Sequence, residues 1–193
     1  MTDWNGKPTD FDYVYLADED LPGWPIASAW PPLNDLTLLK KIDNAGLRGP
    51  TLYIYSTRNL PEPEWSVFKN TADELHLTGL SVNANKDKLY MDSYWQSPKH
   101  SPTLDYSYFI HLTPVGEPSV ILGQQDGSLG VHRTSTWSDP QEILSGGIQP
   151  FSIPDLPSGE YVVTFGVYFS QTGERLTLDN GQNELELLRF SVF

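Results

Sequence analysis

The sequence predicts a mainly β protein, an antiparallel β-sandwich of the jelly-roll or immunoglobulin-like kind with a small N-terminal α/β unit. The stretch 158–169 alternates throughout, with Tyr161 and Val163 on one face and Val162 and Thr164 on the other. A period of two is typical of a pleated strand, and bulky residues on both faces indicate a central one. About eight such stretches follow one another along the last two-thirds of the chain, separated by turn residues, as in sandwich folds.

The N-terminal part predicts the order strand, helix, strand. Strands are expected at 11–17 and 51–56, where aromatic and β-branched residues are frequent. Between them, Asn34 or Asp35 can cap a helix that runs to about Asn44, with apolar residues at helical spacing. A right-handed crossover would make the two strands parallel.

The composition of the chain predicts two parts joined by a linker. Residues 1–60 form the small α/β unit, which is expected to dock on the sandwich because so few elements cannot bury a core alone. Residues 61–73 begin with two prolines close together and are interpreted as the linker. Residues 74–193 form the β-sandwich domain. Its strands are expected at 74–82, 88–96, 104–113, 119–125, 142–153 (broken), 158–169, 174–178 and 185–193.

The charge and composition exclude several function classes. The net charge of −13 argues against a nucleic-acid partner, because binding phosphates needs clustered Lys and Arg. No apolar run approaches the roughly 20 residues of a membrane span, so no direct membrane insertion is expected. The first twelve residues are polar and acidic, so they are not expected to act as a signal peptide. The absence of cysteine excludes disulfides and thiolate metal sites, and no feature predicts an oligomeric state.

Six short motifs occur in a fixed order along the second part of the chain. They are Phe-Ile-His-Leu at 109–112, Gln-Asp-Gly at 125–127, Thr-Ser-Thr-Trp at 134–137, Leu-Pro-Ser-Gly-Glu-Tyr at 156–161, Gly-Val-Tyr at 166–168 and Thr-Gly-Glu-Arg-Leu at 172–176. This order resembles the C-terminal β-sandwich domain of bacterial membrane glycosyltransferases that use polyprenyl-phosphate sugars. The segment 11–56 resembles the short α/β stretch that precedes that domain.

The resemblance implies an extracytoplasmic accessory domain rather than a transferase, because the multi-span catalytic part of that family is not in this chain. Two departures stand out. Arg133 replaces the family's proline before Thr-Ser, and the sequence Asp-Pro-Gln-Glu at 139–142 replaces its Pro-Gly-Glu.

A polar loop at 126–138 holds the candidate ligand-binding residues Trp137, Arg133, His132 and Asp126. Sugar rings stack on aromatic side chains while their hydroxyl groups pair with polar neighbours, so this set is a candidate sugar site. The alternative is that Trp137 closes the open end of the sandwich and that Arg133 pairs with Asp126. Buried aromatic side chains are commoner than exposed platforms, which favours this alternative.

No motif indicates reaction chemistry, a cofactor or a metal. The four histidines have no metal-ligand spacing, and no pair among the 25 acidic residues is singled out for hydrolysis. The first hypothesis is therefore a non-catalytic accessory module that binds a glycan or a protein partner. The second is a structural, partner-docking domain of a membrane or cell-surface assembly. The third is a small glycoside hydrolase with two catalytic carboxylates.

Overall fold

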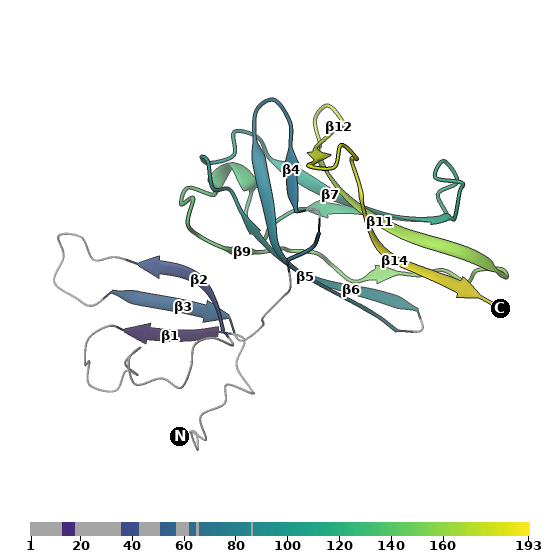
Figure 1. Cartoon of the computed structure of the whole chain (residues 1–193), viewed down its shortest axis with the longest axis horizontal. Helices are drawn as coiled ribbons and strands as arrows, with labels where there is room; N and C mark the ends of the chain where they lie inside the picture. Colours follow the sequence, from purple (N-terminus) through teal and green to yellow (C-terminus); the bar gives the residue numbers. More distant parts are fainter. Residues whose placement is uncertain (1–12, 18–35, 43–50, 57–61, 65, 86) are drawn as a thin grey trace, which may run out of the picture. The chain divides into compact units, whose positions relative to one another are not determined.

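The chain is described by a computed structural model that divides into two compact units, residues 1–60 and 61–193 (Figure 1). The residues that it describes are 13–17, 36–42, 51–56, 62–64, 66–85 and 87–193. These residues are mainly β, in several antiparallel sheets. The N-terminal Trp/Pro-rich connection, which holds two of the six tryptophans, lies outside the described residues.

The described part of the first unit is a three-stranded sheet in the order β1-β3-β2. Its strands are β1 (Tyr13–Ala17), β2 (Thr37–Ile42) and β3 (Leu52–Ser56). Both strand pairs are antiparallel, so the predicted parallel arrangement of the first and last strands is wrong.

The predicted helix is also wrong, because its central part is strand β2. A β-bulge between Leu38 and Lys40 inserts one residue into the pairing with β3. A bulge shifts the alternation by one position, so an apolar spacing of three suits a bulged strand as well as a helical turn. Pairing with β3 satisfies the backbone and overrides the weak helix signal. The α/β unit is therefore not observed.

One sheet of the second unit has the strand order β10-β6-β5-β4-β13, with β9 also paired to β6. Its strands are β4 (Val67–Lys69), β5 (Glu74–Ala84), β6 (Lys88–Gln96), β9 (Leu144–Ser145), β10 (Phe151–Ser152) and β13 (Thr177–Leu178). Strand β4 lies inside the stretch 61–73 that was predicted to be a linker, and it pairs with β5 on one side and β13 on the other.

The other sheet has the order β12-β11-β7-β8, with β14 also paired to β11. Its strands are β7 (Tyr106–Pro114), β8 (Gly123–Ser128), β11 (Gly159–Phe169), β12 (Glu174–Arg175) and β14 (Leu185–Val192). β11 pairs with β7 on one side and with β12 and β14 on the other, and Figure 1 shows it between β7 and β14. The alternating stretch at 158–169 is thus an interior strand, as predicted.

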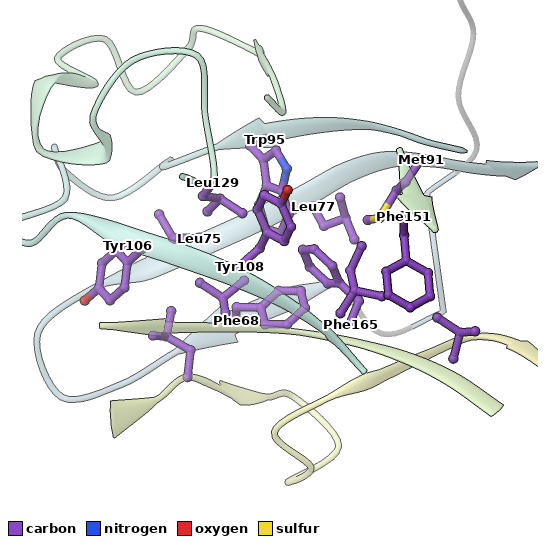
Figure 2. Close-up of a cluster of buried hydrophobic side chains, with 14 of the residues drawn as sticks. Phe68, Leu75, Leu77, Met91, Trp95, Tyr106, Tyr108, Leu129, Phe151 and Phe165 are labelled. Carbon is purple, nitrogen blue, oxygen red and sulfur yellow. The ribbon is translucent and has the colours of Figure 1, made fainter. Parts of the chain in front are cut away.

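The inward side chains of these two sheets form one hydrophobic cluster, a sandwich-like arrangement (Figure 2). The Phe165 ring from β11 lies 6.1 Å from the centroids of both Phe68 on β4 and Trp95 on β6. All three side chains are fully buried. Burying one such side chain stabilises the fold by about 1.5–3 kcal/mol relative to leaving it exposed. The strand faces that carry these side chains therefore turn inward, and the opposite faces of the same strands stay outside.

Candidate functional site

Trp137, predicted as the stacking platform, is a core residue. It follows a short 3-10 helix at Thr134–Thr136, its side chain is only 5% exposed, and it belongs to the hydrophobic cluster. A Cβ atom added to Gly130 would lie 2.8 Å from Cζ2 of the indole, so the ring is packed directly onto that backbone. The burial of Trp137 agrees with the packing alternative, but Arg133 is paired with Asp105 and not with Asp126, the partner that this alternative names.

The other three predicted residues are not brought together around Trp137. Arg133 is 80% exposed, and its Nη1 lies 3.8 Å from Oδ2 of Asp105. The Ser135 hydroxyl donates to Asp105 at 2.6 Å; this bond, and more weakly the charge of Arg133, lowers the pKa of the Asp105 carboxyl. His132 is exposed in the same loop. Asp126 instead lies on β8.

Asp126 borders a hollow on the outward face of the sheet that contains β7, β8, β11 and β12. We call it the outer-face depression. It has a volume of about 410 Å³ and is lined by Phe109, His111, Ile121, Gln124, Asp126, Tyr168, Gly173 and Arg175.

Strand register explains why these residues are neighbours. Phe109 on β7 is paired with Asp126 on β8, and His111, two residues along β7, is paired with Gln124. On the other side, Tyr168 of β11 is paired with Arg175 of β12. Residues two apart on a strand share a face, so the pairing gathers them on one surface.

The floor of the depression is aromatic and almost completely covered. Phe109 is 3% exposed and His111 is 8% exposed, with ring centroids 4.6 Å apart. Gly166 of β11 is paired with Phe109, and a Cβ atom there would lie 2.2 Å from Cζ of the Phe109 ring. The glycine therefore provides the space that lets the ring lie flat against the sheet. The guanidinium of Arg175 lies over the Phe109 ring.

The polar rim contains the carboxylate of Asp126 and the guanidinium of Arg175. Nε2 of Gln124 donates to Oδ2 of Asp126 at 2.6 Å. Burial, followed by the charge and hydrogen bond of Asp126, raises the pKa of the Tyr168 phenol, so that hydroxyl stays protonated. Glu184 is not a lining residue of the depression, but its carboxylate lies 3.7 Å from Arg175 and accepts a hydrogen bond from the Thr164 hydroxyl at 3.2 Å.

The imidazole of His111 is neutral in this setting at neutral pH. Burial is the main cause that lowers its pKa, and the positive charge of Arg175 acts in the same direction. The carboxylates of Glu184 and Asp126 act in the opposite direction but do not reverse the shift. The depression thus holds one guanidinium and the carboxylate of Asp126 beside a neutral imidazole, and Glu184 lies next to that guanidinium outside the lining.

The residues that line the depression can orient a polar ligand. Within the described residues, no group of three or more His, Asp or Glu side chains could hold a metal ion. The same part of the chain contains no helix that is both long and apolar enough to cross a membrane. Polar groups that are already hydrogen-bonded around an aromatic floor can orient a ligand.

Of the four residues predicted from the sequence, Asp126 lines this depression, although it was predicted as a neighbour of Trp137. The sequence prediction of a site did not include Phe109, His111, Gln124, Tyr168 or Arg175. The signal was present in two local patterns, because an aromatic residue and a histidine two apart, and a glutamine and an aspartate two apart, each share one strand face. The pairing of those two strands is a long-range contact that no local pattern reports.

No model of a known protein family matches the chain, and no curated protein matches its sequence. The resemblance to a glycosyltransferase accessory domain therefore stays a prediction. The candidate site is the outer-face depression, and it rests on the geometry of the described residues.

Proposed function

We propose that residues 61–193 form a β-sandwich of the jelly-roll or immunoglobulin-like kind that acts as a non-catalytic accessory module and binds carbohydrate. The observation that carries this proposal is the outer-face depression, in which Tyr168 and the exposed Ile121 lie beside Asp126, Gln124 and Arg175. Sugars present apolar C–H faces and polar hydroxyl edges together, which a hollow of mixed character matches. Of the four residues predicted from the sequence, Asp126 is retained in this site.

The proposal describes recognition and not hydrolysis. A glycosidase needs two carboxylates flanking the scissile bond, one of them able to act as an acid. Here Glu184 is held by Arg175 and Thr164, and Asp126 is held by Gln124. A carboxylate that is already engaged in this way is better placed to accept hydrogen bonds from sugar hydroxyl groups than to donate a proton. By its resemblance, the module would work outside the cytoplasm beside a membrane glycosyltransferase.

A glycan array tests the proposal directly. The unmodified protein is expected to bind at least one class of glycan, and Tyr168→Ala and Gln124→Ala are expected to weaken the signal. His132→Ala, an exposed substitution away from the depression, serves as the matched control and should bind normally. If the unmodified protein gives no signal with any glycan, the proposal is wrong.

One observation favours the second candidate, a structural domain that docks a partner in a membrane or cell-surface assembly. Val120, Ile121 and Leu122 form a run of exposed apolar side chains immediately before β8, with exposed fractions of 39–46%. Contiguous exposed apolar groups mark interaction surfaces. This candidate predicts self-association in light scattering that Leu122→Asp removes, while binding to glycans is absent.

A further inference from the structure

We infer that the outer-face depression selects an uncharged sugar and binds it through two neighbouring hydroxyl groups, both of which donate to the carboxylate of Asp126. This inference rests on the proposed function and names the ligand class of that site. It follows from the hydrogen-bond capacity of Asp126, from the charge of the surroundings and from the apolar edge of the hollow.

Asp126 is held in place yet keeps unused acceptor capacity. The amide of Gln124 donates to Oδ2 at 2.6 Å, and the Tyr168 hydroxyl bonds to the same carboxylate. An ionised carboxylate offers about four lone-pair positions, so about two stay available on the exposed side chain. Two adjacent hydroxyl groups of a sugar ring can donate to one planar carboxylate, and bonds to a charged acceptor are the stronger kind.

The pre-formed geometry lowers the cost of binding. An unrestrained side chain loses rotamer freedom when a ligand fixes it, and that loss weakens binding. Gln124 lies two residues from Asp126 on the same strand, and its amide already restrains the carboxylate in the absence of ligand. An open surface hollow can therefore bind a small polar molecule without first ordering its own acceptor.

The charge of the depression excludes acidic sugars. The guanidinium of Arg175 has Glu184 as its partner at 3.7 Å, while Asp126 adds a further negative charge. His111 is neutral and contributes no positive charge. The whole chain carries a net charge of −13, which repels anions at longer range as well. A uronate or a sulfated sugar would bring its charge close to Asp126, and like charges across an interface are unfavourable.

An apolar edge completes the match with a neutral sugar. Ile121 is 46% exposed, and the half-buried Tyr168 lies on the far side of the same hollow. Arg175, 37% exposed, can donate from its guanidinium to ring or hydroxyl oxygens. A volume of about 410 Å³ falls within the usual range of small-molecule sites, about 300–1,000 Å³.

The test compares neutral and acidic oligosaccharides by isothermal titration with the full chain. The neutral set is cello-, manno- and galacto-oligosaccharides, and the acidic set is oligogalacturonate, hyaluronan and heparin fragments. We expect binding from the neutral set only. Asp126→Asn removes the charge of the acceptor with little change of shape, and it should weaken binding by roughly 10- to 100-fold, as expected for bonds to a charged group.

Asp155→Asn is the matched control, because Asp155 is an exposed aspartate outside the lining of the depression. It should bind as the unmodified protein does, and thermal melts should show that both variants are folded. Binding of acidic sugars alone, or neutral binding that Asp126→Asn leaves unchanged, overturns this inference but leaves the proposed function standing. Failure of both sets to bind overturns the proposed function as well.

Discussion

The guanidinium carbon of Arg175 lies 4.2 Å from the centroid of the Phe109 ring. Phe109 points away from the core, because its neighbours Tyr108 and Ile110 occupy the inward positions of β7. An outward phenylalanine on a sheet is normally exposed to water, yet this ring is 3% exposed. The arginine is therefore part of the cover that closes the outer face of the sheet.

Arg175→Ala is expected to uncover Phe109 and to lower the free energy of unfolding by about 1 kcal/mol, the scale of a cation–π contact at a partly exposed site. The loss of its apolar stem adds to this effect. Urea unfolding followed by tryptophan fluorescence measures the change. Arg189→Ala provides the control, since Arg189 and its partner Glu186 both occupy exposed positions of strand β14. An equal loss in both variants would contradict a covering role for Arg175.

Gly166→Ala is expected to destabilise the fold by about 1–3 kcal/mol, the usual cost of forcing an extra methyl into packed space. The new Cβ would lie 2.2 Å from Cζ and 2.3 Å from Cε1 of Phe109, and 2.9 Å from the backbone oxygen of Asn183. The measurement is a double-mutant cycle with Phe109→Leu, because a smaller side chain relieves the ring clash. If the loss of unfolding free energy in the double variant equals the sum of the losses in the two single variants, Gly166 and Phe109 do not interact.

The sequence was sufficient to predict the strands of the second unit that alternate strongly. Strand β6 has the predicted bounds, 88–96, and β11 differs by one residue at its start. The stretch predicted as a strand at 119–125 begins only at Gly123, since Val120 to Leu122 are exposed outside the ladder. Local alternation is a property of one strand, so it could be read without knowing any neighbour.

The prediction of a helix at 35–44 was wrong, and the residues predicted around Trp137 are not gathered there. In both places the structure depends on long-range contacts that the sequence does not show. Lys40 and Ile54 are paired because β2 runs antiparallel to β3. The bulge in β2 gives its apolar residues a spacing that is also found in helices. In the same way, Asp126 and Trp137 are 11 positions apart in the chain, but one lies on an outward strand position and the other in the core. Which face a loop residue takes is decided by long-range packing.

Trp137→Ala is expected to lower the free energy of unfolding by about 3–5 kcal/mol, the range for removing a large aromatic side chain from a core. The loss follows from the 5% exposure of the indole and its packing on Gly130. Chemical unfolding measures it, with exposed His132→Ala expected to stay within about 0.5 kcal/mol of the unmodified protein. A folded, equally stable Trp137→Ala protein that no longer binds glycan would instead restore Trp137 as a stacking platform.

Acidification below neutral pH is expected to destabilise the fold through His111. Burial, and next the charge of Arg175, lowers the pKa of its imidazole below the ordinary value of 6.5, against the opposing charges of Glu184 and Asp126. The unfolded chain then binds more protons than the folded protein, and stability rises with pH wherever that holds. The contribution is fully present above about pH 6.5 and is lost as the pH falls through the folded pKa. Urea unfolding between pH 8 and pH 5 should show this slope, His111→Gln should flatten it, and exposed His132→Gln should keep it; an unchanged slope in His111→Gln would assign it to another group.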